Sequence, residues 1–244
     1  MLQWKMRNFI KIFCYLCGLV KKYALPCFGG TIAGIFIYDF LPFVLSLSVG
    51  NFAAGLFAKA FSLACLPMLI TTVFNRITTP LYGRFALDQL CCKDIFLKSQ
   101  IVKAVILLPI IFGLQQTAFA WLPILLGSRW IGIIPLYRIL SLYALFRAHY
   151  DDLGALVNLG LGKPALLAKN QLLHAGLVLL SLPAQLYFKS VIFACVLSSV
   201  WMIVVCMRLW YQIFIELDIT STDILNSVMN LKNRGLSIVF KTTG

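Results

Sequence analysis

The chain has 244 residues, of which 61% are hydrophobic and only 12% are charged, and its formal net charge at pH 7 is +13. Roughly a quarter of the residues of a soluble domain are charged, so this composition excludes an ordinary water-soluble fold. A net positive charge can also suit a nucleic-acid partner, and the positions of the cations along the chain decide between that reading and a membrane protein.

Long apolar stretches fill most of the chain between Tyr23 and Trp210. A helix rises about 1.5 Å per residue, so crossing about 30 Å of hydrocarbon takes roughly 20 residues. Membrane-spanning strands would alternate apolar and polar residues, and runs such as AVILLPIIFGL do not alternate. We therefore expect an all-α membrane protein. Its bundle should have about six transmembrane helices, at Ala24–Ser48, Phe52–Thr72, Ile101–Leu126, Ile131–Leu159, Ala165–Tyr187 and Val191–Tyr211.

The two ends of the chain differ in character from its middle. Residues 1–22 combine several cations with a short apolar run and predict a basic interfacial helix. Residues 23–214 would form the six-helix transmembrane bundle. Residues 215–244 predict an amphipathic cytoplasmic tail. The apolar side of that tail would carry Ile224, Leu225, Val228 and Met229.

The distribution of Lys and Arg around the predicted spans gives an orientation. With the N-terminus in the cytoplasm, roughly sixteen cations, Lys103 among them, fall on the cytoplasmic side. About two, Arg129 and Lys189, fall outside. The positive-inside rule therefore predicts that both termini are cytoplasmic. Anionic headgroups of membrane lipids are the expected counter-charge, so no nucleic-acid partner is predicted.

Cysteine spacing and short catalytic motifs give no sign of an enzyme. The chain has 8 cysteines, but Cys14 with Cys17 and Cys91 with Cys92 are the only close pairs, and no second C-x-x-C or nearby His completes a zinc set. The sequence also lacks a P-loop, a G-x-S-x-G and an H-E-x-x-H. We expect no catalytic residue, no metal and no cofactor.

Ionisable residues inside the predicted spans are the candidate site residues, because charge is costly at membrane depth and usually faces a partner or a watery cavity. Asp39 and Lys59 lie at comparable depths on two adjacent antiparallel helices. They could form an ion pair. The sequence leaves open whether such a pair would line a cavity or only neutralise itself for insertion.

The fourth span, within PLYRILSLYALFRAHYDDLGALVNLGLGKP, holds the richest set of charges. At 100° per residue, Arg147 and Asp151 share one face, whereas Arg138 lies about 180° from Arg147. The two arginines cannot line one cavity on a straight helix, and Arg138 could extend outwards to the interface. Arg147 with Asp151 is the stronger candidate for a site. The alternative is an intrahelical pair at a helix interface. His149 and His174 are weaker candidates.

Two ordered segments of the chain carry a recognisable set of motifs. The run VGNFAAGLFAKAFSLACLPMLITTVFNRITTPLYGRF contains the pattern G-x4-G-(L/Y)-(F/Y)-x2-A…P…P. The run LLGSRWIGIIPLYRILSLYALFRAHYDDLGALVNLGLGKP is similar to the pattern G-x-x-W…P-L-x-R-I-L-x-L…R…G-x-L-x-N-x-x-G-(K/R)-P. In these motifs the chain resembles the C-terminal half of bacterial polysaccharide-export and O-antigen flippases, of the multidrug/oligosaccharidyl-lipid/polysaccharide exporter superfamily.

By this resemblance, the chain would move an undecaprenyl-diphosphate-linked oligosaccharide across the bacterial inner membrane for O-antigen, capsule or exopolysaccharide assembly. We hypothesise that Arg147, Lys59 and Arg138 bind the diphosphate or acidic sugars, because Arg contacts phosphate oxygens bidentately. Further residues would hold those cations or relay coupling ions: Asp39, Asp151 and Asp152.

One bundle cannot rock against itself, and alternating access normally requires two. The chain would therefore pair with a separately encoded N-terminal half, pair with a second copy, or be the product of an interrupted gene. Two other functions stay open at this point. One is a membrane-embedded glycosyl- or acyltransferase that uses Asp151, Asp152 and His149 as acid or base, which the short predicted loops disfavour. The other is a non-transporting scaffold subunit of a polysaccharide-assembly complex.

Overall fold

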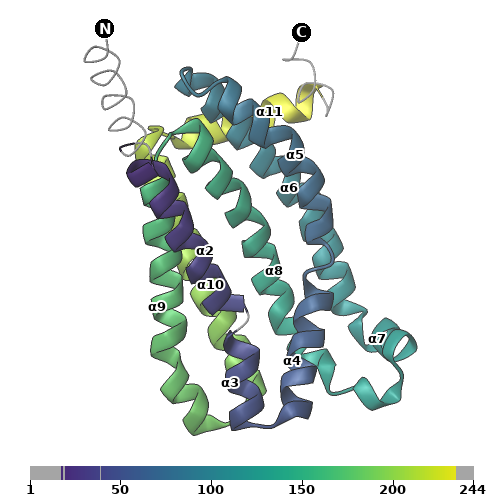
Figure 1. Ribbon diagram of the computed structural model, residues 1–244. Helices are drawn as coiled ribbons and strands as arrows, with labels where there is room; N and C mark the ends of the chain where they lie inside the picture. Colours follow the sequence, from purple (N-terminus) through teal and green to yellow (C-terminus); the bar gives the residue numbers. More distant parts are fainter. Residues whose placement is uncertain (1–17, 19, 39, 235–244) are drawn as a thin grey trace, which may run out of the picture.

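The computed structural model describes residues 18, 20–38 and 40–234, and every element in that part of the chain is a helix (Figure 1). In chain order, the elements are η1 (Val20–Ala24), α2 (Leu25–Tyr38), α3 (Phe40–Ser48), α4 (Asn51–Ala64), α5 (Met68–Arg84), α6 (Gln89–Gln116), α7 (Ala118–Leu126), η2 (Ser128–Trp130), α8 (Ile133–Ala155), η3 (Leu156–Gly160), α9 (Pro164–Phe188), α10 (Val191–Glu216) and α11 (Ser221–Arg234).

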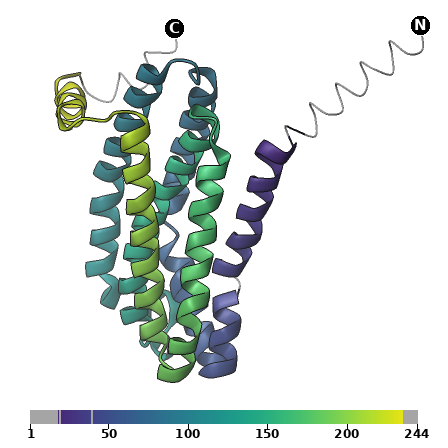
Figure 2. The same ribbon diagram turned by 90° about the vertical axis from the view of Figure 1, so that its left-hand side faces the viewer.

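The helices form one elongated bundle (Figures 1 and 2). Helix α8 runs through its centre, packed against α10 on one side and against α4 and α5 on the other, while α2 packs on α9. Helix α7 lies beside the bundle at one end, and α11 lies crosswise at the opposite end, where the first turns of α2 are also found (Figure 1). The start and the end of the described chain therefore lie at the same end of the bundle.

The prediction of an all-α membrane protein is confirmed for the described part of the chain, whereas the number of spans is confirmed only in part. Helices α6, α9 and α10 are each long and apolar enough to cross a membrane, and α4 with α5 would make a fourth, bent span. Helix α8 carries four charged side chains and a histidine, which lower its apolar character. The predicted first span is divided between α2 and α3, and Asp39 between them lies outside the described residues, as does nearly all of the predicted interfacial helix at residues 1–22.

The predicted second span is bent rather than straight. Helix α4 ends at Ala64, α5 begins at Met68, and the two helices meet at an angle of 49°. Pro67 causes the break, because proline has no backbone N–H to continue the helix and disfavours helical geometry in the residue before it. Proline is tolerated at a helix start, and Pro67 takes the N-cap position of α5.

The third span begins at Gln89 rather than at Ile101, which corrects the prediction. Asp88 caps the helix, since its Oδ1 accepts a hydrogen bond from the backbone N–H of Cys91 at 3.0 Å. The polar residues of the first three turns resembled a cytoplasmic loop in the sequence. Because α6 begins at Gln89, Lys103 lies well inside this helix and is fully buried, instead of facing the cytoplasm at a helix end.

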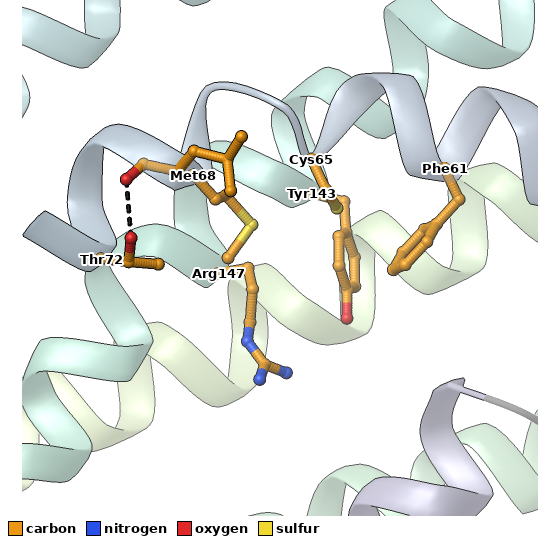
Figure 3. Close-up of a pocket in the computed structure, with 7 residues that line it drawn as sticks. Phe61, Cys65, Met68, Thr72, Tyr143 and Arg147 are labelled. Carbon is orange, nitrogen blue, oxygen red and sulfur yellow. Dashed lines mark hydrogen bonds between the residues drawn. The ribbon is translucent and has the colours of Figure 1, made fainter.

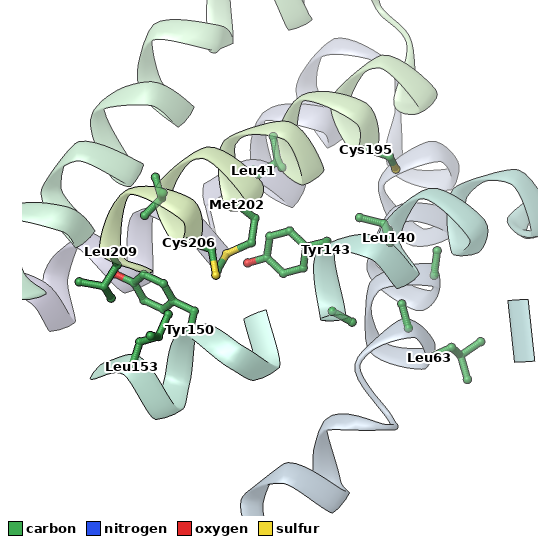
Figure 4. Close-up of a cluster of buried hydrophobic side chains, with 14 of the residues drawn as sticks. Leu41, Leu63, Leu140, Tyr143, Tyr150, Leu153, Cys195, Met202, Cys206 and Leu209 are labelled. Carbon is green, nitrogen blue, oxygen red and sulfur yellow. The ribbon is translucent and has the colours of Figure 1, made fainter. Parts of the chain in front are cut away.

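The contact between α8 and α10 is the most extensive in the bundle. Tyr143 of α8 points its ring towards Met202 and Cys206 of α10 (Figure 4), and all three side chains are buried. In lipid the association of helices depends on close packing and interhelical hydrogen bonds rather than on hydrophobic transfer. Small polar residues of α10 make such bonds here: Ser199 Oγ donates to the carbonyl of Ile139 at 3.2 Å.

Helix α11 is held to the start of α6 by one ion pair. Lys93 Nζ lies 2.6 Å from Asp223 Oδ2 and donates to the carbonyl of Asp218 at 2.9 Å. Asp223 also accepts from the backbone N–H of Thr220 at 2.8 Å, which is the reciprocal half of a capping box. On the predicted apolar side of α11, Leu225, Val228 and Met229 are exposed, and only Ile224 packs against the core.

We expect Asp223→Ala to release α11 from the bundle. The change removes both the partner of Lys93 and the capping acceptor of Thr220, so backbone amides of α11 should exchange hydrogen markedly faster in a deuterium-exchange measurement. Asp94→Ala is the matched control, because Asp94 pairs with Lys98 of its own helix. Equal protection of α11 in the two variants would contradict this account.

The same contact should be insensitive to pH near neutrality. Hydrogen bonds from Lys93 and Thr220 hold the pKa of Asp223 well below its ordinary value. A carboxylate with a lowered pKa in the folded state stabilises above its unfolded pKa, and that contribution is lost only as the pH falls through the folded value. Protection of α11 should therefore be constant from about pH 8 to about pH 5.

Candidate functional site

Helix α8 directs two adjacent carboxylates to two different sites. Successive helical residues point about 100° apart, so Asp151 and Asp152 cannot face the same neighbours. Asp152 is fully buried against α5 and α6, whereas Asp151 is partly exposed and pairs with Arg147 on its own helix. The two sites differ in what they can contact.

Asp152 is the acceptor at the centre of a buried polar network. Its Oδ1 lies 3.0 Å from Lys103 Nζ, and neither side chain has any exposed surface. Four other side chains donate to the same carboxylate: Thr78 Oγ1 to Oδ1 at 3.0 Å, and Ser99 Oγ at 2.7 Å, Gln100 Nε2 at 2.7 Å and Tyr82 OH at 3.2 Å to Oδ2.

The network extends one step further on each side. Lys103 Nζ donates to Asn75 Oδ1 at 2.6 Å, and Gln100 Oε1 lies 2.6 Å from His149 Nδ1. These contacts join α5, α6 and α8. Taking two charges out of water is costly unless their remaining donors and acceptors are satisfied, and here five donors surround one carboxylate. The arrangement locks three helices together and leaves no surface of Asp152 open to a ligand in this conformation.

The second site is a pocket where α4, α5 and α8 meet (Figure 3). It has a volume of about 300 Å³, and its lining is mostly apolar: Phe61, Cys65, Met68, Leu69, Thr72, Tyr143 and Arg147. Arg147 is the one charged residue in this lining, and in Figure 3 its guanidinium and the Tyr143 hydroxyl point to the same side of α8. The bend at Pro67 places the end of α4 and the start of α5 around one wall.

Arg147 and Asp151 form the i,i+4 pair that their spacing predicts. Arg147 Nε lies 2.9 Å from Asp151 Oδ1, and the two side chains are 25% and 33% exposed. Arginine carries five N–H donors in a planar fork, a geometry that matches the oxygens of carboxylates and phosphates. A partly exposed guanidinium beside an apolar pocket suits an amphiphile with an anionic head.

The other cations of the predicted binding set do not join this pocket. Lys59 is exposed on α4, and none of the described carboxylates lies within ion-pair distance of it. Arg138 is also exposed, and its Nε donates to the carbonyl of Gln115 at the end of α6 at 3.3 Å. Arg138 and Arg147 lie on opposite sides of α8, as their spacing predicts. The proposed partner of Lys59, Asp39, lies outside the described residues.

Lys103 lies elsewhere than the sequence predicts. The sequence places it among the cytoplasmic cations, because the third span is predicted to begin at Ile101, only two residues before it. A local signal for the earlier helix start is present in the sequence, because Asp88 is a capping residue three positions before the N–H that it caps. A helix that begins after Asp88 places Lys103 inside the span. A lysine at that depth needs a carboxylate partner, and Asp152 provides it.

The apolar helices and the charges buried between them define an integral membrane protein of the helix-bundle type. A family model described as "Polysaccharide biosynthesis protein" matches residues 2–135, which is more than half of the chain. The chain belongs to this family of polysaccharide biosynthesis proteins, which confirms the resemblance seen in the sequence.

Two characterised relatives match at low identity. The teichuronic acid biosynthesis protein TuaB of Bacillus subtilis (strain 168) is 20% identical over 110 residues, which cover 45% of this chain and 23% of TuaB. The lipopolysaccharide biosynthesis protein WzxC of Escherichia coli (strain K12) is 26% identical over 115 residues, which cover 47% of this chain and 23% of WzxC. The matched part thus spans less than a quarter of each relative. No solved structure matches the chain.

Proposed function

We propose that the chain takes part in moving an undecaprenyl-diphosphate-linked oligosaccharide from the inner to the outer leaflet of the bacterial inner membrane, for assembly of O-antigen, capsule or another exopolysaccharide. The observation that carries the proposal is Arg147 at an apolar pocket between helices, in a chain of a polysaccharide biosynthesis family. Transport of this kind changes no covalent bond, so the chain would not be an enzyme.

The pocket suits the part of such a substrate that is hardest to move. A diphosphate carries charge that hydrocarbon excludes, and a guanidinium can bind phosphate oxygens with two parallel hydrogen bonds. The apolar walls suit the first units of a polyprenyl tail. The volume of about 300 Å³ is at the lower end of the range of volumes of ligand-binding pockets. The pocket would therefore hold the headgroup and leave the oligosaccharide outside it.

A second helical bundle would complete the path for the sugar. Alternating access depends on two bundles that rock around a site near the membrane midplane. We propose that the second bundle is supplied either by a separately encoded N-terminal half or by a second copy of this chain. In either case the pocket around Arg147 would face the partner bundle.

Several features support an orientation with both termini in the cytoplasm. The first turns of α2 and all of α11 lie at one end of the bundle, and the turn between α9 and α10 lies at the other (Figure 1). Lys93 and Lys163 belong to the α11 end, where they pair with Asp223 and Glu216. Lys21 of η1 and Arg84 at the end of α5 belong to this end as well, whereas Arg129 and Lys189 belong to the opposite end. The cation excess is therefore at the α11 end, as the positive-inside rule requires of the cytoplasmic side.

The structure gives little support to the transferase alternative. A general acid or base must reach its substrate, but the Asp152 carboxylate is enclosed by five donors and the His149 ring is bonded to Gln100. The segment from Arg76 to Lys98, which lies between the second and third predicted spans, is helical except for the turn at 85–88. That turn is too short to build a catalytic loop.

Deletion of the gene in its native host tests the proposal. We expect loss of the surface polysaccharide together with accumulation of complete lipid-linked oligosaccharide on the cytoplasmic leaflet, measured by mass spectrometry of extracted lipids. Truncated oligosaccharides would instead indicate a glycosyltransferase. Unchanged surface polysaccharide and unchanged precursor levels would overturn the proposal.

A further inference from the structure

A second pocket lies between the start of α6 and the crosswise helix α11, and it shares no lining residue with the pocket at Arg147. Its volume is about 200 Å³, and residues of both helices line it: Leu90, Lys93, Asp94, Leu97, Asp223, Asn226 and Ser227. Unlike the pocket at Arg147, it carries charges of both signs. We propose that this pocket, named here the α6–α11 pocket, binds the headgroup of a zwitterionic phospholipid that bears a primary ammonium.

The position of the pocket along α6 matches the depth of lipid headgroups. Helix α6 has 28 residues, about eight more than the roughly 20 that cross the hydrocarbon core. Three of its four charged side chains, Lys93, Asp94 and Lys98, belong to the first three turns, and the fourth, Lys103, is buried, so the surplus length falls at the cytoplasmic interface. Helix α11 lies beside the bundle at the same level and crosswise to the spans (Figure 2).

Exposed apolar side chains lie on both helices that form the pocket, beside it on α6 and on the face of α11 opposite to its lining. Leu87 and Leu90 on the α6 side, and Leu225, Val228 and Met229 on the α11 side, are all exposed. Isolated apolar side chains on a surface need no explanation, but these occupy one end of a membrane protein next to a polar pocket. A helix with such a face lies naturally in the headgroup region with that face in lipid. The tails of a lipid in the pocket would pass over Leu87 and Leu90 into the lipid layer that holds the apolar face of α11.

The balance of charge selects the kind of headgroup. The lining holds one cation, Lys93, which lies against Asp223, and a second carboxylate, Asp94, which lies against Lys98 outside the lining. An anionic headgroup would be repelled by Asp94 and Asp223 as much as it is attracted by the lysines. A zwitterion matches both signs: its phosphate would bond to Lys93 and the Asn226 amide, and its ammonium to Asp94, whose side chain is 48% exposed.

The size of the pocket agrees with that ligand. A water molecule in the liquid takes about 30 Å³, so 200 Å³ holds about six or seven groups of that size. A phosphate with a two-carbon amine arm fills such a space, whereas a sugar headgroup is larger. A quaternary ammonium has no N–H to donate to Asp94, so it would bind less well than a primary one.

Lipid retention by the purified chain tests the proposal without reference to transport. The full chain is reconstituted in nanodiscs of equal parts phosphatidylethanolamine, phosphatidylcholine and phosphatidylglycerol, released into detergent, and its retained lipids are identified by native mass spectrometry. We expect phosphatidylethanolamine to be enriched at least about threefold over the other two lipids, and Asp94→Asn to abolish that enrichment. Asp94→Asn leaves the Lys93–Asp223 contact that holds α11 intact.

Glu216→Gln is the matched control, because Glu216 forms an ion pair with Lys163 at the same end of the bundle but does not line the pocket. It should retain lipid as the original chain does. Equal or greater retention of phosphatidylglycerol by the original chain would show general attraction to the basic surface and overturn the proposal. Enrichment that survives Asp94→Asn, or that is lost in Glu216→Gln, would overturn it as well.

Discussion

Replacing Lys103 with Met is expected to lower the free energy of unfolding by about 3–5 kcal/mol, the largest effect of any substitution proposed for this chain. The change leaves the Asp152 carboxylate in a site with no exposed surface and without its counter-charge. The remaining donors to Asp152 are neutral and cannot replace an ammonium at 3.0 Å. Denaturant unfolding of the purified chain in detergent micelles measures the loss.

A double-mutant cycle separates the ion pair from the packing around it. Lys103→Met with Asp152→Leu removes both charges, so the pair of changes should destabilise less than the sum of the two single changes by about 2 kcal/mol or more. Additive effects would show that the two charges do not interact and would contradict the buried pair.

Lys163→Met is the control for this series. Lys163 also pairs with a carboxylate, Glu216, but both side chains are about a third or more exposed. Exposed pairs contribute about 0–1 kcal/mol because water screens them and the side chains lose freedom in forming them. If Lys103→Met lowered the free energy of unfolding no more than Lys163→Met does, the Asp152 network would not be what holds α5, α6 and α8 together.

Replacing Arg147 with Ala is expected to weaken binding of a polyprenyl diphosphate by about 10- to 100-fold, because hydrogen bonds to charged groups contribute about 1.5–3 kcal/mol. Arg147→Lys should recover part of the affinity, since an ammonium keeps the charge but loses the planar, two-point contact. Isothermal titration of the diphosphate lipid into the purified full chain in detergent measures the difference in affinity. The uncharged polyprenol serves as the reference ligand.

The arginine on the other side of α8 supplies the control for this prediction. Arg138→Ala removes a cation of the same helix that bonds to Gln115 and lies outside the pocket, so affinity should change less than about twofold. Unfolding of each variant is measured alongside, because a purely structural role of Arg147 would alter stability rather than affinity. Equal affinity of Arg147→Ala and the original chain would rule out the binding role.

Local patterns were sufficient for several parts of the fold. The expected helices at Ala165–Tyr187 and Val191–Tyr211 correspond to α9 and α10, whose mostly apolar runs are flanked by Pro164 and by the turn at Lys189 and Ser190. The pair of Arg147 with Asp151 followed from helical spacing alone, since residues four apart are neighbours on any helix.

Local patterns failed where a polar segment was helical. The first turns of α6 contain as many charges as a loop would. The sequence therefore predicts a later start of this helix than the structure shows, and it places Lys103 at the surface. Its burial rests on contacts from other helices. Asp152 is 49 positions away in the chain, and no spacing rule links residues on different helices.

By itself, the sequence determined that this protein is a helical membrane protein of a polysaccharide family, that its cations favour one side, and that Arg147 pairs with Asp151. The family follows from the resemblance of two ordered motif segments, and the other properties depend on composition, on the length of apolar runs and on contacts within one helix. Only the tertiary structure decided that Asp152 belongs to a buried network with Lys103, that Arg147 alone of the three proposed cations lines the α4–α5–α8 pocket, and that α11 forms a second pocket with α6. The reason is physical: in lipid, which helices meet and which faces they present depend on close packing and on the pairing of buried polar groups between distant segments.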